Sequence, residues 1–289
     1  MEYAARDHAS VDEFLGAAGS FLQAHEAENN LLFGICSNIR AAPHLFTDEP
    51  PTFASVTDRT GRVVAASLRT PPFNQVLSWV DELDATVALV ERLRDRPLPG
   101  IVGPKFGAAR FVAAWTAATG QPARIEFAER IFRLERVIPP VTPAPGAWRI
   151  VEGRDRDLIA GWLVAFHDEA TPESPPVRDP PAVADRLVAQ VGRIGYVWED
   201  GGEVVSLVGA GGETPNGVRI GPVYTPPERR GRGYASALTA AASQDQLDRG
   251  RRFVFLFTDL ANPTSNKIYQ AIGYEAVCDV DQYLFGADA

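Results

Sequence analysis

One stretch decides the fold, and it reads Ile220-Gly-Pro-Val-Tyr-Thr-Pro-Pro-Glu-Arg-Arg-Gly-Arg-Gly-Tyr-Ala-Ser-Ala-Leu238. An apolar run that predicts a strand leads into a loop rich in glycine and arginine, and an alanine-rich run after the loop predicts a helix. Gly231 and Gly233 lack a Cβ, so the loop can bring its backbone N–H groups close to an anion, and the helix N-terminus adds partial positive charge. The stretch therefore predicts a binding site for phosphate or pyrophosphate.

Two common phosphate-binding motifs do not fit this loop. A Walker A loop ends in Gly-Lys-Ser/Thr, and the loop contains no lysine. A dinucleotide fingerprint has three small residues early in a βαβ unit, whereas here Ser236 takes the third position and the loop follows predicted hairpin strands. The ligand is therefore expected to be another phosphate-bearing molecule.

The pattern Arg230-x-x-Gly233-x-Ala235 resembles the Q/R-x-x-G-x-G/A motif of the GNAT superfamily of acyl-CoA N-acyltransferases. The resemblance implies that this loop holds the pyrophosphate of coenzyme A, and that the strand before it splays from its neighbour to pair with the pantetheine arm. Gly221 and Pro222 inside that strand favour a bulge. The residues assigned to the cofactor on this basis are Val223, Tyr224, Thr225, Arg230, Gly231, Arg232, Gly233, Tyr234, Ala235 and Ser236.

A second block, Asp259 to Tyr274, supports the same resemblance independently. Asn262 suits a helix N-cap and Pro263 the first helical position. Asn262, Asn266 and Tyr269 then fall at i, i+4 and i+7 on one helix face. The block is similar to the family's N-x-x-(A/S)-x-x-x-Y-x-x-x-G-F/Y segment, which implies that Asn262 contacts the cofactor and that Tyr269 protonates the departing thiolate. Asn266, on the same face, is assigned to the cofactor as well.

Several residues are candidates for the general base. An alkyl amine has a pKa near ~10.4, so a base or a water chain must remove its proton before it attacks a thioester. Asp168 and Glu169, at the end of a predicted helix over Asp155 to Ala170, are the residues we select first. The remaining candidates are Glu173, His167 and Asp259. Cys278 is interpreted as a small buried residue, so an acyl-cysteine route is disfavoured.

The proline-rich segment Ile138–Gly146 predicts a linker between domains over 1–138 and 146–289. The first half repeats the element order of the second faintly, with Gly61-Arg-Val-Val64 matching Gly202-Glu-Val-Val205. At the position of the phosphate loop the first half has Asp81-Glu-Leu-Asp84, whose acidic side chains would repel an anion. The resemblance thus implies an α+β GNAT fold, a mixed and mostly antiparallel sheet flanked by helices, in two tandem copies of which the first is degenerate.

The composition argues against several classes of binding partner. The 289 residues carry a net charge of −9, which argues against nucleic acid. Two cysteines and four histidines without ligand spacing predict no metal site. No secretory signal or membrane segment is recognised, so a cytoplasmic protein without a membrane partner, either a monomer or a homodimer, is expected.

The combined expectation is an N-acetyltransferase that moves an acetyl group from acetyl-CoA to a primary amine by direct transfer in a ternary complex. The acidic residues near 168–173 suit a cationic small-molecule or peptide amine as acceptor. Two alternatives stay open: a coenzyme-A-binding sensor or scaffold without turnover, and a transferase of a longer acyl group.

Overall fold

The computed structural model describes residues 2–42, 49–172 and 174–286, and the chain divides into two compact units. The first unit comprises Met1–Ile131, Asp259–Ala261 and Val277–Ala289, and the second comprises Phe132–Thr258 and Asn262–Ala276. The final strand of the chain belongs to the first unit because it pairs with a strand of the first half. The domain limits at 138 and 146 stay a prediction.

The first unit is a sheet covered by helices, with the strand order β1-β2-β3-β4-β5-β12-β6. Neighbours from β1 to β4 are antiparallel, β4 and β5 are parallel, and β12 is antiparallel to β5. Phe111 and Trp115 on one helix and Leu89 on another fill the core against this sheet. The elements are β1 (Ala4–His8), α1 (Val11–Ala24), α2 (Asn30–Ala41), β2 (Thr52–Thr57), β3 (Val63–Arg69), β4 (Gln75–Leu77), α3 (Ala85–Leu93), β5 (Gly100–Pro104), α4 (Lys105–Thr119), β6 (Ala123–Leu134) and β12 (Glu275–Phe285).

The second unit repeats this plan with the strand order β11-β10-β9-β8-β7. Strands β7 to β10 are antiparallel neighbours, and β10 is parallel to β11. The elements are β7 (Ala147–Ile150), α5 (Arg156–Ala170), α6 (Pro180–Ala189), β8 (Arg193–Asp200), β9 (Glu203–Gly211), β10 (Gly217–Tyr224), α7 (Tyr234–Asp248), β11 (Phe253–Asp259) and α8 (Pro263–Ala271).

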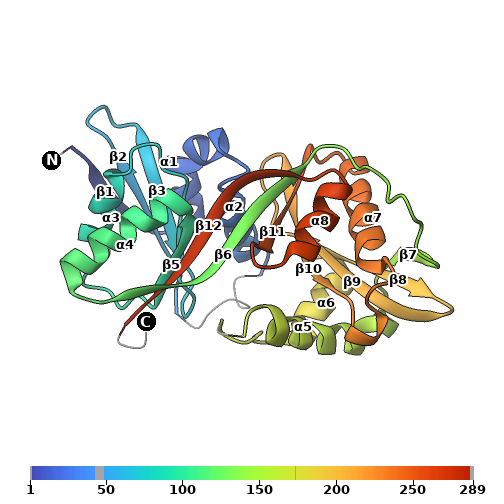
Figure 1. The fold of residues 1–289 in the computed structure, drawn as a ribbon. Coiled ribbons are helices and arrows are strands. Elements are labelled where there is room, and N and C mark those ends of the chain that lie inside the picture. Colours follow the sequence, from blue (N-terminus) through green and yellow to red (C-terminus); the bar gives the residue numbers. More distant parts are fainter. Residues whose placement is uncertain (1, 43–48, 173, 287–289) are drawn as a thin grey trace. The chain divides into compact units, whose positions relative to one another are not determined.

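Helices cover both faces of the sheet in the second unit (Figure 1). Val197 of β8 and Leu207 of β9 pack with Ile159 of α5 and Leu187 of α6. Tyr196, the residue before Val197, points to the other face and joins the core formed with α7 and α8. Alternate residues of a strand point to opposite faces, so these contacts fix which residues of β8 and β9 face which helix pair.

This architecture confirms the predicted fold class, and two local signals explain part of it. The helix expected over Asp155 to Ala170 is α5, and Ile159 and Leu163 on its apolar face are buried. The hairpin between β8 and β9 turns through Gly201 and Gly202, both with positive φ, as the glycine pair predicts. The helices within the described ranges include none that is long and apolar enough to cross a membrane.

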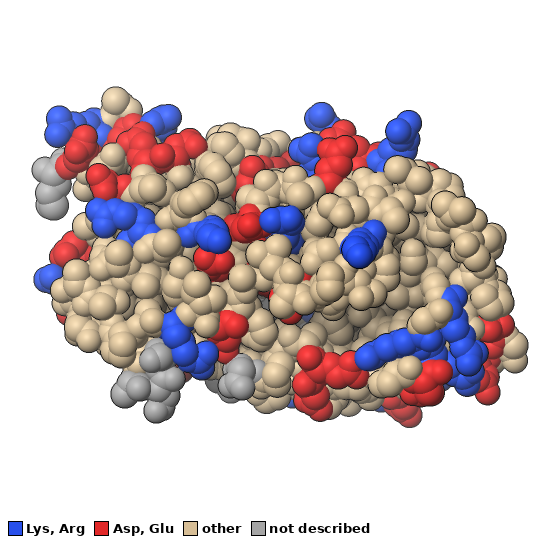
Figure 2. Space-filling view, in the orientation of Figure 1, with Lys and Arg blue, Asp and Glu red and all other residues tan. Residues whose placement is uncertain are grey.

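Basic and acidic side chains lie intermixed on the face drawn in Figure 2. Basic and acidic side chains of the described residues form ion pairs, for example Arg149 with Asp155 and Arg156 with Asp185. One such pair, between Arg230 of the loop after β10 and Glu169 at the end of α5, bears on the candidate site.

Candidate functional site

Strand β10 contains a bulge where Gly221 and Pro222 stand. Ile220 pairs with Ala210 of β9, and Val223 pairs with Val208. Between these two pairs β10 advances by three residues and β9 by two. The parallel ladder between β10 and β11 runs from Gly217 to Arg219 on β10 and comes before this bulge. The bulge turns the second half of β10 away from the regular ladder, which suits the expected pairing of Val223 and Thr225 with an extended ligand.

The loop after β10 is shaped for an anion. Gly231 and Gly233 adopt φ of +77° and +80°, in the left-handed region that favours glycine. Gly233 is the N-cap of α7, and no side chain caps that helix end. Among the described residues, a Cβ at Gly231 would meet nothing within 4 Å, and one at Gly233 would meet only Ala144, at 3.9 Å. Left-handed glycines and N–H groups without a side-chain cap suit the binding of a phosphate group.

The predicted residues around this helix end differ in what their side chains can reach. Arg232 is exposed, whereas Ala235 and Ser236 are half-buried in the first turn of α7. The side chain of Tyr234 is buried, and its hydroxyl donates a hydrogen bond to Asp200 at 2.5 Å. Tyr234 can therefore meet an anion at the loop only through its backbone.

Arg230 connects the loop to α5. Its Nε donates to the carbonyl of Thr225 at 2.8 Å, and its Nη2 donates to Oε2 of Glu169 at 2.5 Å. The hydroxyl of Tyr224 lies 3.3 Å from the other carboxylate oxygen of Glu169. Burial, and then the charge of Glu169, raise the pKa of Tyr224. The carboxylate selected from the sequence as a base is thus the partner of the arginine selected for the cofactor.

The end of β10 is fixed by a residue that the sequence reasoning missed. Ser206 of β9 donates to the carbonyl of Tyr224 at 3.0 Å, and its hydroxyl lies 2.8 Å from that of Thr225. Both hydroxyl-bearing side chains are buried. A serine within an otherwise apolar strand that pairs with β10 is the signal that would have pointed to it.

Helix α8 begins as the second block predicts. Oδ1 of Asn262 accepts a hydrogen bond from the backbone N–H of Ser265 at 3.1 Å, and Asn266 donates to the carbonyl of Asn262 at 2.8 Å. Tyr269 is buried, with its ring 6.0 Å from that of Tyr274, and burial raises its pKa to about 12. Asn262 is therefore an N-cap, and the cofactor roles of the two asparagines stay predictions.

The other candidate bases lie in different settings. Asp168 is exposed, and Nδ1 of His167 lies 3.2 Å from the hydroxyl of Thr171. Asp259 falls in the first unit and accepts a hydrogen bond from the N–H of Ala261. Glu173 lies outside the described residues.

The two cysteines are shielded rather than activated. Cys36 is buried, whereas Cys278, which the sequence predicted to be buried, is half-buried on β12. Burial raises the pKa of each thiol to about 12, the opposite of what a cysteine nucleophile needs. The described residues hold no cluster of three or more His, Cys, Asp or Glu side chains that could bind a metal ion.

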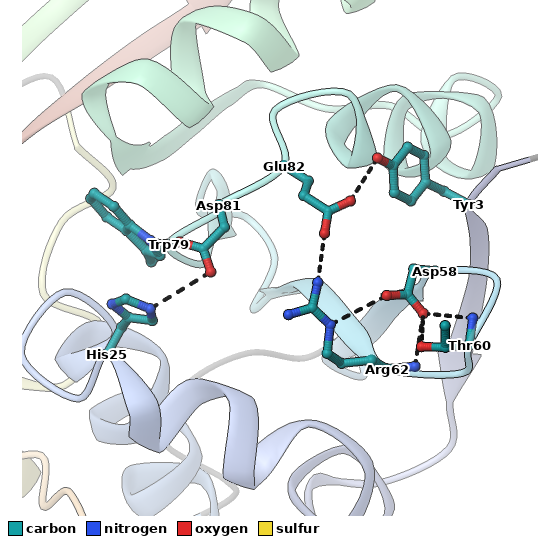
Figure 3. Close-up of polar contacts among 8 residues, drawn as sticks. All are labelled: Tyr3, His25, Asp58, Thr60, Arg62, Trp79, Asp81 and Glu82. Atoms are coloured by element: carbon teal, nitrogen blue, oxygen red, sulfur yellow. Dashed lines mark hydrogen bonds and ion pairs between the residues drawn. The ribbon is translucent and has the colours of Figure 1, made fainter.

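The first unit has acidic side chains at the corresponding place, between β4 and α3 (Figure 3). Glu82 accepts hydrogen bonds from Arg62 at 2.6 Å and from the hydroxyl of Tyr3 at 2.7 Å. Asp81 accepts from the indole N–H of Trp79 at 2.8 Å, and His25 stacks on that indole with ring centroids 5.4 Å apart. Carboxylates and their partners thus stand where the second unit presents an open, glycine-lined helix end.

Comparison with known proteins agrees with this geometry. Residues 162–274, from α5 to the residue before β12, match the model of the acetyltransferase (GNAT) family. The second half of this chain carries a GNAT domain. No curated protein sequence matches the chain.

Solved structures extend the likeness to both halves. A Drosophila protein superimposes with a TM-score of 0.69 at 14% identity, covering 99% of each chain. A tandem GNAT protein from the clavulanic acid biosynthesis pathway gives 0.59 at 17% identity, covering 99% of this chain and 98% of its own. A GNAT-family acetyltransferase from Colwellia psychrerythraea gives 0.57 at 9% identity, over 97% and 99%. The predicted tandem GNAT fold is confirmed, and the family supports an acyl-CoA-dependent transferase.

Proposed function

We propose that the GNAT domain transfers an acetyl group from acetyl-CoA to a primary amine, directly and within a ternary complex. The observation that carries the proposal is the uncapped N-terminus of α7 behind Gly231 and Gly233, placed directly after a bulged strand. Backbone N–H groups there would hold the pyrophosphate, with Arg230 and Arg232 supplying full charges. Val223, Tyr224 and Thr225 would align the pantetheine arm along β10.

We assign Tyr269 the role of general acid. Its raised pKa means that the hydroxyl keeps its proton at neutral pH, as a donor to the departing thiolate must. A coenzyme A thiol has a pKa near that of a free cysteine, ~8.5, so the proton transfer to the thiolate needs a well-positioned donor rather than a strong acid. The buried position of Tyr269 against Tyr274 holds the ring in one orientation.

Glu169 is the base candidate that the contacts favour over Asp168. Both residues are exposed, but the carboxylate of Glu169 lies 3.3 Å from the hydroxyl of Tyr224 at the end of β10. When the pyrophosphate takes Arg230, Glu169 loses its ion-pair partner and is left beside the strand that would carry the thioester. Asn262 and Asn266 would line the cofactor from α8.

The ion pair between Glu169 and Arg230 also favours a second candidate function, a coenzyme-A-binding scaffold without turnover. In that function the carboxylate would only position the arginine, and no group would deprotonate an amine. Release of free thiol from acetyl-CoA in the presence of a panel of amines separates the two functions. Binding of acetyl-CoA together with thiol release supports the enzyme, and binding without release for any amine of the panel supports the scaffold.

A further inference from the structure

Three arginines gather on the α5 and α6 side of the sheet in the second unit. Arg193 at the start of β8 and Arg219 on β10 both pair with Gly211 of β9, so they flank it about 10 Å apart across the sheet. Gly195, two residues after Arg193, faces the side chain of Leu187 on α6, which places Arg193 on that face as well. Arg186 lies beside Leu187 on α6.

The gap between the two strand arginines contains no side chain from the middle strand. A Cβ at Gly211 would lie 2.7 Å from the Cβ of Arg193 and 3.1 Å from the carbonyl oxygen of Gly192, so only glycine fits there. Arg219 turns its guanidinium over the ring of Phe257, 5.8 Å from the centroid. Arg193 therefore packs closely over Gly211, and Arg219 on the other side of Gly211 lies against an aromatic ring.

Two of these arginines have buried nitrogens that lack a partner within the described chain. Nε of Arg193 and Nη2 of Arg186 are both buried without a hydrogen bond, although Nε of Arg186 donates to the carbonyl of Val191. Burial, and then the charges of Arg186 and Arg219, lower the pKa of Arg193 to about 10. Buried guanidinium nitrogens without acceptors are costly, and an anion would satisfy them.

The arginine cluster (Arg186, Arg193 and Arg219) lies near the bulge in β10, and this position suggests what it could bind. Arg219 is the last residue of the ladder with β11, and the bulge at Gly221 and Pro222 follows it. Val223 and the anion loop lie beyond the bulge, so a cofactor that runs back along β10 from the loop would carry its acyl group toward Arg219. Val223 lies four residue steps along the strand from Arg219, roughly 13 Å, which a small acceptor and an arginine side chain can span together.

We propose that Arg186, Arg193 and Arg219 bind an anionic group of the acyl acceptor, a carboxylate or a phosphate, while its amine meets the thioester near the bulge. The acceptor role rests on the proposed function. The existence of the anion site does not depend on it. The proposal replaces the cationic acceptor expected from the acidic residues near 168–173 with one that carries both an amine and an anion, as amino acids do. Guanidinium groups match carboxylate and phosphate oxygens in geometry and charge.

The anion site is tested first, without acetyl-CoA. Inorganic phosphate is titrated calorimetrically into the full chain, the Arg193→Met and Arg186→Gln variants, Gly233→Asp as a block of the other anion loop, and the exposed Arg154→Gln as a control. In the Gly233→Asp background phosphate should still bind, Arg154→Gln should leave that binding unchanged, and Arg193→Met and Arg186→Gln should each weaken it at least tenfold where the chain stays folded by circular dichroism. Phosphate binding that is absent, that is lost only in Gly233→Asp, or that is unchanged in both cluster variants would overturn the site.

The acceptor role is tested with amine pairs that differ only in a carboxylate: phenylalanine and phenethylamine, lysine and cadaverine, arginine and agmatine. Thiol release should show a kcat/KM at least tenfold higher for the carboxylate member of each accepted pair, and Arg193→Met should remove that preference. Equal or better use of the decarboxylated members overturns the acceptor role. If no acetyl-CoA binds, the proposed function fails, while the phosphate titration still decides whether the anion site exists.

Discussion

The two units differ in the loop that leads from a strand into a helix at the corresponding place of one fold. Between β10 and α7 the second unit has Gly231 and Gly233 in left-handed conformations and leaves the helix end uncapped. Between β4 and α3 the first unit has Asp81 and Glu82, whose carboxylates are held by Trp79 and Arg62. Neither helix end has a side-chain cap and both carry partial positive charge, but carboxylates stand near the first and glycines near the second.

This contrast teaches that a shared strand–loop–helix frame does not imply a shared ligand. In the first unit, side chains of the protein supply negative charge near the helix end. In the second unit two glycines stand at that place instead. The difference lies in a few loop residues, while the parallel pairing of β4 with β5 and of β10 with β11 is the same in both.

The largest expected effect comes from making the second loop resemble the first. Gly233→Asp places a carboxylate at the N-cap of α7 and forces a side chain into a φ of +80°. Strain and charge repulsion act together, so we expect the affinity for acetyl-CoA to fall at least a hundredfold. Calorimetric titration measures it, with Gly231→Ala separating strain from charge. An affinity within threefold of the unmodified chain would remove the loop from the site.

The next effect concerns Tyr269. Tyr269→Phe deletes the proposed proton donor, so kcat should fall by about a hundredfold while the dissociation constant of acetyl-CoA stays unchanged. Because burial raises the pKa of Tyr269 to about 12, its ionisation should produce no alkaline fall in kcat below about pH 10. Steady-state kinetics across pH checks both statements, and an unchanged kcat in the variant rejects the role.

A smaller effect is expected at Glu169. Glu169→Gln frees Arg230 for the pyrophosphate, and an exposed ion pair contributes about 0.2–1 kcal/mol, so acetyl-CoA should bind up to about fivefold more tightly. The matched control is Asp168→Asn, which removes the same charge one residue away. Tighter binding in Glu169→Gln alone supports the contact, whereas equal changes in both variants would reduce it to a general charge effect.

The smallest effect is expected in the first unit. Replacing Asp81 by Asn and Glu82 by Gln removes two surface carboxylates and should lower the free energy of unfolding by about 1 kcal/mol or less. It should not create a second site for acetyl-CoA, because the loop still lacks glycines. Denaturant unfolding and the binding stoichiometry check the two parts, and a second equivalent of bound cofactor would contradict the comparison.

Much of this fold could be predicted from the sequence. The apolar spacing in α5, the glycine turn between β8 and β9, and the Asn262 cap of α8 are local signals, and each gives the expected element. Strand β1 was missed because its five residues alternate in burial without turn residues that mark it. The pairing of β12 with β5 was missed as well, since a strand's partner depends on the whole sheet rather than on its own residues.

Part of the candidate site could likewise be predicted from the sequence, and part could not. The bulge in β10 and the left-handed glycines of the loop after it follow from proline and glycine chemistry and could be predicted. The contact between Glu169 and Arg230 brings together residues 61 positions apart. The row formed by Arg193, Gly211 and Arg219 depends on strand register. Neither arrangement leaves a local trace in the sequence, so both required the structure.

The most direct test of the central claim is a calorimetric titration of the full chain with acetyl-CoA, beside the Arg230→Glu/Gly233→Asp variant and the Asp81→Asn/Glu82→Gln variant. The account predicts one bound acetyl-CoA per chain, no detectable binding in the first variant and unchanged binding in the second. Binding that survives in the first variant, a stoichiometry of two, or no binding to the folded chain would contradict it.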